Sequence, residues 1–345
     1  MGRIMGALAV VAAVAAAVAV VRAGTPEPAT PRGGWTEFTS SLHKPDERNF
    51  RLDIAVDRKT GRLFVAKWFN GVWMSDDRGE TFKRSDDEKV SRGGPFSCYA
   101  LFADPAGGRL AVFNMNNRPG SSGYTLDGGK TWTSFESVGR NWDYGAVDWD
   151  SKSVIAVRHE HPGVHVSKDM GKTWKQVDIS RRRVKGVGVL PGGVLVVCEA
   201  GRIKRSEDHG QTWVTVAEQN CRGTVSVFEG VGYWLAYQYE RSGGEIEQKA
   251  LILVTKDKGK TWKPLGEGLK DAVFCTGPCF GKSADHLVVG TLESIVESTD
   301  GGRTWKKVAA YPPDTPDGSH HNNGCAYPSV AYDPTGDVFY AYLVG

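Results

Sequence analysis

The chain has 345 residues, a formal net charge of +3 at pH 7, 43 glycines and 11 tryptophans. The nearly balanced charge excludes a strongly basic protein that binds nucleic acid through its phosphates. The glycine and tryptophan content argues for a folded domain rather than a disordered chain. This composition is typical of an all-β domain outside the cytoplasm.

The first 34 residues differ from the rest of the chain. Arg3 precedes an apolar run of 17 residues from Met5 to Val21, and Val21-Arg22-Ala23 matches a small-x-small cleavage site. This pattern predicts a signal peptide over residues 1–23. An uncleaved membrane anchor is the alternative, because the run is slightly long for the apolar core of a signal peptide and slightly short for a spanning helix. Residues 24–34 are rich in proline and glycine and predict a flexible tether. The domain is therefore expected to be secreted or periplasmic, or held at the membrane.

A motif of the form Ser/Thr-x-Asp-x-Gly-x-Thr-Trp/Phe occurs six times, and its aspartates recur at intervals of 50, 42, 39, 49 and 43 residues. In such a turn the aspartate accepts hydrogen bonds from backbone N–H groups, the glycine adopts a positive φ, and the threonine starts the next strand. No copy has the further acidic positions of an EF-hand calcium loop. We therefore expect six rigid hairpins, whose structural aspartates are Asp77, Asp127, Asp169, Asp208, Asp257 and Asp300.

Alternating apolar residues predict two strands and a short third strand before each motif and a fourth strand after it. The repeat length matches one four-stranded propeller blade, and six such blades extend from Phe50 to about Ala309. Residues 328–344 supply two more strands, and residues 33–38 resemble the fourth-strand sequence at 129–135. We predict that residues 35–345 form one all-β domain, a seven-bladed β-propeller whose closing blade is built from both termini. A six-bladed ring with extra strands is the alternative.

These motifs resemble the Asp boxes of the sialidase-type, or BNR-repeat, β-propellers, and the resemblance covers nearly all of the mature chain. In that family the boxes are structural and lie on the face away from the ligand. The resemblance implies a binding site on the opposite face, which we call the loop face. It consists of the loops between the second and third strands of each blade and the links between blades.

The side chains expected on the loop face include aromatic rings, arginines and carboxylates, a mixture that suits a polyhydroxylated or anionic ligand. A glycosidase needs two carboxylates across a sugar. Asp143 lies between two aromatic residues and Glu160 between two histidines, so these two are the candidate catalytic residues. The candidate ligand-binding residues are Arg51, Trp68, Arg140, Trp142, Tyr144, Arg158, His159, His161, Glu199, Arg222, Tyr237, Glu293, His320 and His321.

The resemblance to a sialidase active site is partial. Phe50-Arg51-Leu52 is similar to the Phe-Arg-Ile-Pro sequence of that family, which implies that Arg51 holds the first position of its arginine clamp. Asp53 replaces the proline, and the loop that carries the family's acid/base aspartate contains none before the first Asp box. Exo-sialidase activity is therefore not expected, and hydrolysis of another glycan is left open.

Metal and cofactor chemistry has little support in the sequence. In an extended segment His159 and His161 point the same way and could form half of a metal site with His320 or His321. Their spacing matches no established signature, so no metal is expected. No motif indicates a nucleotide, a flavin or a haem, and we expect no cofactor.

The six cysteines of an exported chain permit disulfides and allow fifteen connectivities. Cys198 lies in a predicted strand and Cys221 in the loop that opens the next blade, so these two could meet. Cys275 and Cys325 open strands of consecutive blades, and Cys279, close to Cys275, complicates any pairing.

Two functions follow from these observations. The first is an exported propeller of the sialidase superfamily that binds a glycan on its loop face and, if it is an enzyme, hydrolyses it. The alternative is a non-catalytic propeller that binds a protein partner there, as sortilin-like receptors and assembly factors with related repeats do. In both cases we expect a monomer that does not bind nucleic acid.

Overall fold

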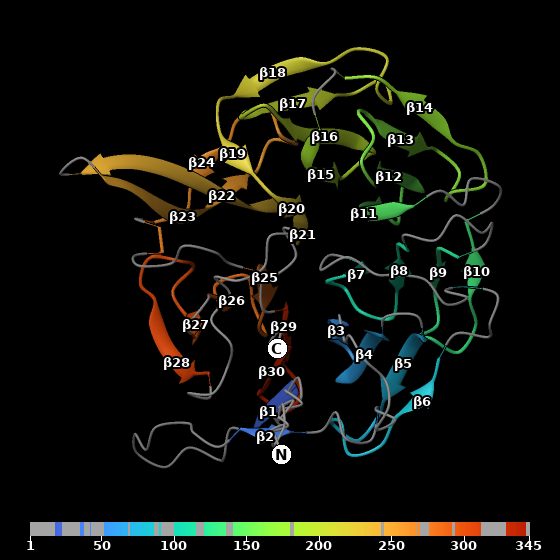
Figure 1. The fold of residues 1–345 in the computed structure, drawn as a ribbon, viewed down its shortest axis with the longest axis vertical. Helices are drawn as coiled ribbons and strands as arrows, with labels where there is room; N and C mark the ends of the chain where they lie inside the picture. The colour runs from blue at the N-terminus through green and yellow to red at the C-terminus, as the bar shows by residue number, and fades with distance from the viewer. Residues whose placement is uncertain are drawn as a thin grey trace, which may run out of the picture.

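The computed structural model describes residues 18–22, 35–37, 42, 52–67, 70–85, 90, 100–114, 121–135, 141–179, 183–242, 245–266, 268–269, 276–291, 294–311 and 329–342. Within these ranges the regular elements are β-strands arranged as sheets around a central axis (Figure 1). No helix in them is long and apolar enough to cross a membrane. The chain is an all-β propeller.

The first three sheets are antiparallel and run in chain order from the centre outwards (Figure 1). Their strands are β3 (Leu52–Asp57), β4 (Arg62–Lys67), β5 (Gly71–Ser75) and β6 (Lys83–Arg84); β7 (Leu101–Ala103), β8 (Leu110–Val112), β9 (Gly123–Thr125) and β10 (Thr133–Ser134); and β11 (Trp142–Asp148), β12 (Ser153–Arg158), β13 (Val164–Ser167) and β14 (Lys175–Val177).

The next three sheets follow the same plan with additions. The fourth contains β15 (Val184–Leu190), β16 (Val194–Glu199), β17 (Arg202–Ser206) and β18 (Val214–Ala217). Its inner strand also pairs in parallel with β20 (Gly223–Thr224), which belongs to the link to the next sheet. The fifth contains β19 (Asn220–Cys221), β21 (Ser226–Phe228), β22 (Val231–Ser242), β23 (Glu245–Thr255) and β24 (Lys263–Pro264). The sixth contains β25 (Thr276–Phe280), β26 (Leu287–Gly290), β27 (Ser294–Ser298) and β28 (Lys306–Ala310).

Each of these six sheets carries one Asp box between its third and fourth strands, and the hydrogen bonds explain the motif. In the third box the Ser167 hydroxyl donates to Asp169 Oδ1 over 2.7 Å, while the backbone N–H and hydroxyl of Thr173 donate to the same carboxylate over 2.9 and 2.6 Å. Gly171 has a φ of +76°, and a Cβ at this position would lie 2.2 Å from the Phe135 ring. The box is thus a closed turn that only glycine completes.

The aromatic residue after each box packs into the space between neighbouring sheets. The six residues contact five separate hydrophobic clusters: Phe82, Trp132, Trp174, Trp213, Trp262 and Trp305. In the largest cluster, Trp142 is 2% exposed and its ring centroid lies 5.1 Å from that of Trp174. The repeats therefore build a core distributed between sheets rather than one central core.

A further sheet joins the two ends of the described chain, in the order β2 (Thr36–Glu37), β1 (Val18–Arg22), β30 (Val338–Tyr342) and β29 (Ser329–Asp333). It contains no Asp box. Beside it, Trp35 Nε1 donates to the carbonyl of Ala310 over 2.6 Å. Six blades, each with its own box, fit the alternative of a six-bladed ring with extra strands better than the seven-bladed expectation, which is not confirmed. The strands of this sheet also differ from those predicted for the closing blade. The strand next to β30 is β1, which comes from the segment predicted as a signal peptide.

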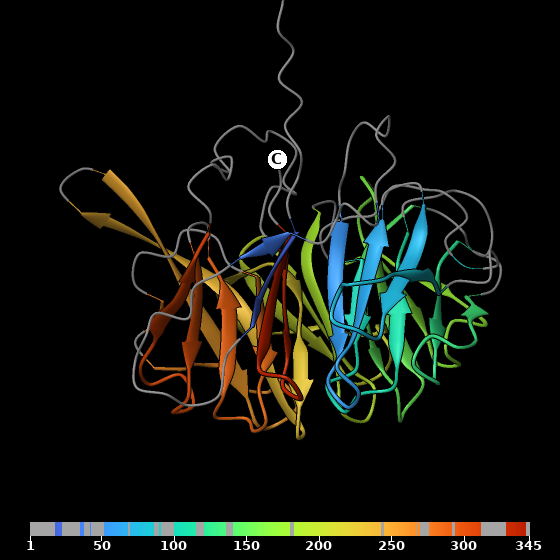
Figure 2. The ribbon, with the colours of Figure 1, turned by 90° about the horizontal axis from the view of Figure 1, so that it is seen from below.

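The β22–β23 hairpin is much longer than the other hairpins and rises out of the disc (Figure 2). Its pairing runs without a break from Gly232 opposite Thr255 to Ser242 opposite Glu245. Neighbouring strands pair only with its base, since β19 reaches Tyr237 and β24 reaches Leu253, and an isolated bridge joins Ala250 to Leu269. We call the outer part, residues 238–249, the arm.

Candidate functional site

Asp143, His159, Glu160 and Arg183 lie together at the loop-face end of β11 and β12, and we call them the Asp143 cluster. Asp143 occupies a β-bulge, where the register shifts between Trp142 and Tyr144. It accepts a hydrogen bond from His159 Nδ1 over 2.7 Å. Glu160 Oε1 lies 3.9 Å from His159 Nε2 and 3.3 Å from Arg183 Nη2.

The environment of Asp143 disfavours its ionised form. Burial raises the pKa of this carboxyl, and the nearby His159 opposes the rise. Glu160 and Arg183 have side chains that are each 65% exposed, so solvent screens their pairing. The Asp143 carboxyl therefore resists ionisation more than a solvent-exposed aspartate does.

The geometry of the two candidate catalytic residues differs from that of a glycosidase. Such an enzyme holds its two carboxyl groups across an open space that the sugar enters. Here Asp143 and Glu160 approach opposite nitrogens of one imidazole, so the His159 ring fills the space between them. The pair offers no gap for a glycosidic bond.

Three of the expected ligand-binding residues are buried, so they present no surface to a ligand on the loop face. Trp142 packs between Trp174 and His165. Glu199 is 4% exposed and lies 3.1 Å from Lys204 Nζ. Tyr237 is 3% exposed. Sequence reasoning placed these residues in loops at the surface, whereas the strands continue through them and turn their side chains towards neighbouring sheets.

The remaining expected residues are spread over the loop face rather than gathered at one point. Tyr144 donates its hydroxyl to the carbonyl of Val184 over 3.2 Å. Arg158 is half-buried and His161 is exposed. Arg222 lies over the Tyr237 ring, 5.9 Å from its centroid. Six further candidates lie outside the described residues: Arg51, Trp68, Arg140, Glu293, His320 and His321. In the described part of the chain no three histidine, cysteine or acidic residues are placed to hold a metal ion.

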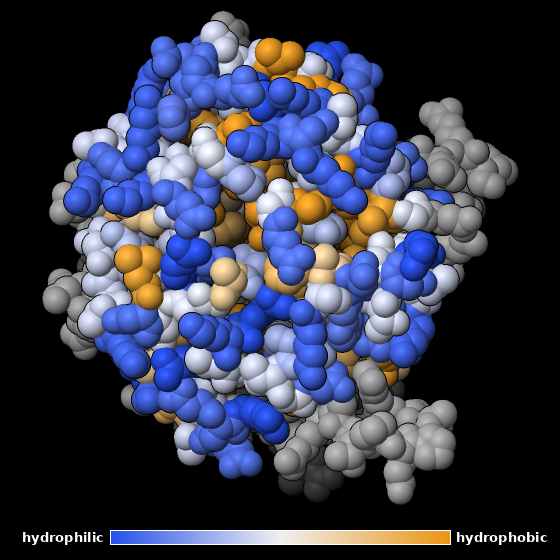
Figure 3. Space-filling view, turned by 180° about the vertical axis from the view of Figure 1, so that it is seen from behind, coloured by the Kyte–Doolittle hydropathy of each residue, from blue (hydrophilic) through white to orange (hydrophobic). Residues whose placement is uncertain are grey.

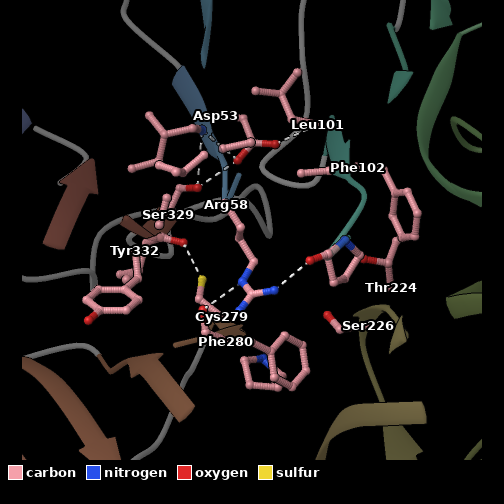
Figure 4. Close-up of a pocket in the computed structure, with 18 of the residues that line it drawn as sticks. Asp53, Arg58, Leu101, Phe102, Thr224, Ser226, Cys279, Phe280, Ser329 and Tyr332 are labelled. Carbon is pink, nitrogen blue, oxygen red and sulfur yellow. Dashed lines mark hydrogen bonds between the residues drawn. The ribbon is translucent and has the colours of Figure 1, made fainter. Parts of the chain in front are cut away.

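A cavity of about 160 Å³ lies on the central axis between the inner strands β3, β7, β20, β21, β25 and β29 (Figure 4). Arg58 crosses one end of it. Its Nε donates to the carbonyl of Phe280 over 3.1 Å and its Nη1 to that of Pro105 over 2.6 Å, and it also bonds the carbonyl of Gly281. The guanidinium lies 4.5 Å from the centroid of the Phe228 ring. The Arg58 side chain thus connects the turn after β3 with the ends of β7, β21 and β25.

Asp53 makes a second connection around the cavity (Figure 4). It is 4% exposed and accepts hydrogen bonds from Leu101 N over 2.8 Å, Ile54 N over 3.0 Å and the Ser329 hydroxyl over 2.7 Å. Burial raises the pKa of Asp53 to about 7, although these hydrogen bonds oppose the rise. Asp53 therefore ties β3 to both of its neighbouring inner strands, β7 and β29.

Sequence reasoning did not single out Arg58 or Ser329. It noted Asp53 only as a departure from a family motif and Cys279 only as a cysteine that complicates disulfide pairing. The signal that could have found them is a polar residue within an otherwise apolar inner strand or directly after it. The space-filling view from behind shows a hollow near the axis with hydrophobic side chains at its edge, surrounded by a mostly hydrophilic surface (Figure 3). The cavity of about 160 Å³ is small for a large ligand, because typical ligand pockets have volumes of roughly 300–1,000 Å³.

Comparison with known proteins supports the fold. The BNR/Asp-box repeat family model matches residues 296–307, which contain the sixth box. The photosystem II assembly protein Ycf48 of Synechococcus sp. (strain JA-3-3Ab) is 24% identical over 176 residues, which cover 39% of this chain and 52% of that protein. The chain thus spans about half the length of this curated relative.

Among solved structures, an ancestral GH74 enzyme is similar with a TM-score of 0.52 and 14% identity, covering 85% of this chain and 44% of the enzyme. YCF48 bound to D1 peptide gives a TM-score of 0.45 and 14% identity, covering 85% of this chain and 93% of YCF48. At such identities the likeness concerns the fold alone. The repeats and the fold together identify a β-propeller of the BNR type.

Proposed function

We propose that this chain is a non-catalytic propeller scaffold that binds a protein partner on its loop face during the assembly of a larger complex. The observation that carries this proposal is the sequence similarity to Ycf48, which is named as a photosystem II assembly protein. That similarity was found between the amino-acid sequences, whereas the GH74 enzyme is similar in fold alone. The glycan-directed function expected from the sequence gains no comparable support.

The site geometry favours binding over hydrolysis. His159 stands between Asp143 and Glu160, and Glu199 is buried against Lys204. Among the described candidates Asp143, Glu160 and Glu199, no two carboxylates face each other across a space that a sugar could enter. A scaffold needs no such pair, because it acts through surface shape and unpaired hydrogen-bonding groups.

The arm is the part of the loop face that we propose as the main contact. It is a two-stranded ribbon whose backbone pairing continues to Ser242 and Glu245, but no described strand pairs with its outer edges. Every second residue of an edge strand directs an N–H and a C=O outwards, so an edge can accept one more strand. An extended segment of a partner would bind by adding such a strand.

We further infer that the protein acts outside the cytoplasm and that the sheet of the two chain ends counts as a seventh blade. The first inference rests on the apolar segment at residues 5–21. The second rests on the order β2, β1, β30 and β29 in one sheet, whose inner strand β29 lies beside β3 and β25 of the neighbouring blades. Because a chain cleaved after Ala23 would lack β1, the N-terminal sequence of the exported protein decides whether β1 belongs to that sheet.

The experiment that tests the proposal compares partner capture by two forms of the full chain. In one form residues 239–248 are replaced by Asn-Gly, which closes the hairpin with a two-residue turn after the pair Gln238 and Lys249. Affinity purification with quantitative mass spectrometry should enrich a defined protein set with the wild type and lose it with the shortened arm. The variant Asp178→Ala, at an exposed site outside the arm, is the matched control.

Circular dichroism confirms that the shortened form is folded. Equal capture by both forms would remove the arm from the proposal. A wild-type chain that enriches no protein but binds an immobilised glycan would overturn the proposed function.

A further inference from the structure

Two buried thiols face one another across the boundary between the fourth and fifth sheets. Cys198 lies in β16 and is 1% exposed, and Cys221 lies in β19 and is 0% exposed. The backbone N–H of Cys221 donates to Cys198 Sγ over 3.1 Å. Cys198 Sγ also reaches the carbonyl of Gln219 at 3.4 Å.

The surroundings isolate this pair. It belongs to a hydrophobic cluster that includes Val196, Ile203 and Trp234. The third cysteine with a described side chain, Cys279, lies elsewhere, in the wall of the central cavity, where it donates to the carbonyl of Val330. Among the described cysteines, Cys198 and Cys221 can therefore pair only with each other.

We propose that Cys198 and Cys221 form a disulfide that covalently joins the fourth and fifth blades. Nothing in this inference depends on the proposed function. The 22 residues between them contain the fourth Asp box and the whole of β17 and β18. The bond would therefore join β16 of one blade to β19 of the next and close a loop that contains the outer strands β17 and β18.

The oxidant that the chemistry requires is a disulfide compound, and oxidised glutathione serves as the probe. The Cys198 thiolate attacks one sulfur of glutathione disulfide, which forms a mixed disulfide and releases one glutathione thiolate. Cys221 loses its proton and attacks Cys198 Sγ, which forms the protein disulfide and releases the second glutathione thiolate. Two protein thiols are oxidised, one glutathione disulfide is reduced to two thiols, and the two protons end on the released glutathiones.

The electrostatics assign the order of attack. The hydrogen bond from Cys221 lowers the pKa of Cys198, and Lys185 contributes in the same direction. Burial raises the pKa of Cys221 well above the usual range. Cys198 is thus the first to ionise and the attacking thiol. Both sulfurs are almost inaccessible in the folded protein, so glutathione reaches them after β16 and β19 have come together and before the surrounding cluster closes, and the finished bond is shielded from reductants.

The test is peptide mapping without reduction. The full chain is refolded with oxidised glutathione, its remaining thiols are blocked with iodoacetamide, and it is digested with trypsin. Cleavage after Lys185, Arg202, Arg205 and Arg222 leaves the two cysteines in separate peptides, 186–202 and 206–222. We expect a linked pair of these peptides that disappears on reduction.

The variants Cys198→Ser and Cys221→Ser should each abolish the linked pair, whereas Cys279→Ser should retain it. The oxidised wild type should unfold at a Tm about 5 °C higher than the reduced form, because the crosslink restricts the unfolded chain. Recovery of both peptides unlinked and alkylated after oxidative refolding, or a link from either one to another cysteine, would overturn the proposal. The wild-type map needs no variant to fold.

Discussion

The Asp-box hairpins and the central cavity both depend on buried or half-buried polar side chains, but at different distances along the chain. In a box, Asp169 bonds residues within four positions of itself. At the cavity, Asp53 bonds Ser329 across 276 positions and Arg58 bonds Phe280 across 222. The boxes therefore make each blade, whereas the cavity residues hold the blades in a ring.

The two regions also differ in their response to pH. Burial works against ionisation of Asp169, but hydrogen bonds from Thr173 and Ser167 outweigh it and lower the pKa to about 2. In Asp53 burial dominates and raises the pKa to about 7. An ionised box aspartate therefore stabilises the folded state, whereas Asp53 stabilises it when its carboxyl is protonated.

Arg58→Ala should cause the largest loss of stability. The substitution leaves the carbonyls of Pro105, Phe280 and Gly281 without their donor at the end of the cavity. We expect the free energy of unfolding to fall by about 3 kcal/mol, measured by urea denaturation. Arg303→Ala removes an exposed arginine that bonds one carbonyl and should cost less than about 1 kcal/mol. Equal losses in the two variants would contradict the role of Arg58 in joining blades.

Asp53 should give the protein a pH dependence near neutrality. Its folded-state pKa of about 7 exceeds its ordinary value of 3.8, so its contribution to stability is full below about pH 4 and is lost as the pH rises to 7. Between pH 5 and pH 8 the wild type should lose on the order of 2 kcal/mol through this group. Asp53→Asn cannot ionise and should show a flatter profile by the same measurement. A steeper profile in the variant would refute the assignment.

Asp169→Ala should destabilise the third blade by about 1–2 kcal/mol, because the donors of Ser167 and Thr173 lose their acceptor. Asp178→Ala, at an exposed carboxylate that bonds only Gln176 among the described residues, is the control and should change stability by less than 0.5 kcal/mol, about the usual effect of a surface substitution. The wild type should keep the box contribution above about pH 4 and lose it as the pH falls towards 2. Thermal unfolding at pH 7 and pH 3 measures both effects.

His159→Ala should have the smallest effect on stability, below about 1 kcal/mol, because its partners are partly or largely exposed. Removing the imidazole should raise the pKa of Asp143 further, since His159 opposes the effect of burial. An NMR titration of the Asp143 carboxyl measures the change. A downward shift would contradict the geometry of the Asp143 cluster.

The same contrast explains what could be predicted from the sequence. The boxes and blades were predictable because the bonds of Asp169 are local and every repeat contains them. The proximity of Cys198 and Cys221 was predictable because each lies at the boundary of consecutive blades. Arg58 and Asp53 were not, because their partners are brought together only when the ring closes.

The candidate site was predicted less well for a related reason. Trp142 and Tyr237 have the composition of a carbohydrate platform, but the packing of adjacent sheets buries both rings. Asp143 and Glu160 were predicted on the loop face with no separation assigned, and a bulge and the His159 ring decide their geometry. Sequence shows which groups are present, and only the packing of blades shows which of them face solvent.

Hydrogen–deuterium exchange of the full chain, with and without the captured partner, tests the central claim most directly. The account predicts slower exchange of the backbone amides of the arm, residues 238–249, by tenfold or more when the partner is bound, because an added strand pairs with its open edge. Amides of the Asp-box turns should be unchanged. Protection confined to the Asp-box turns, with none on the arm, would contradict the account.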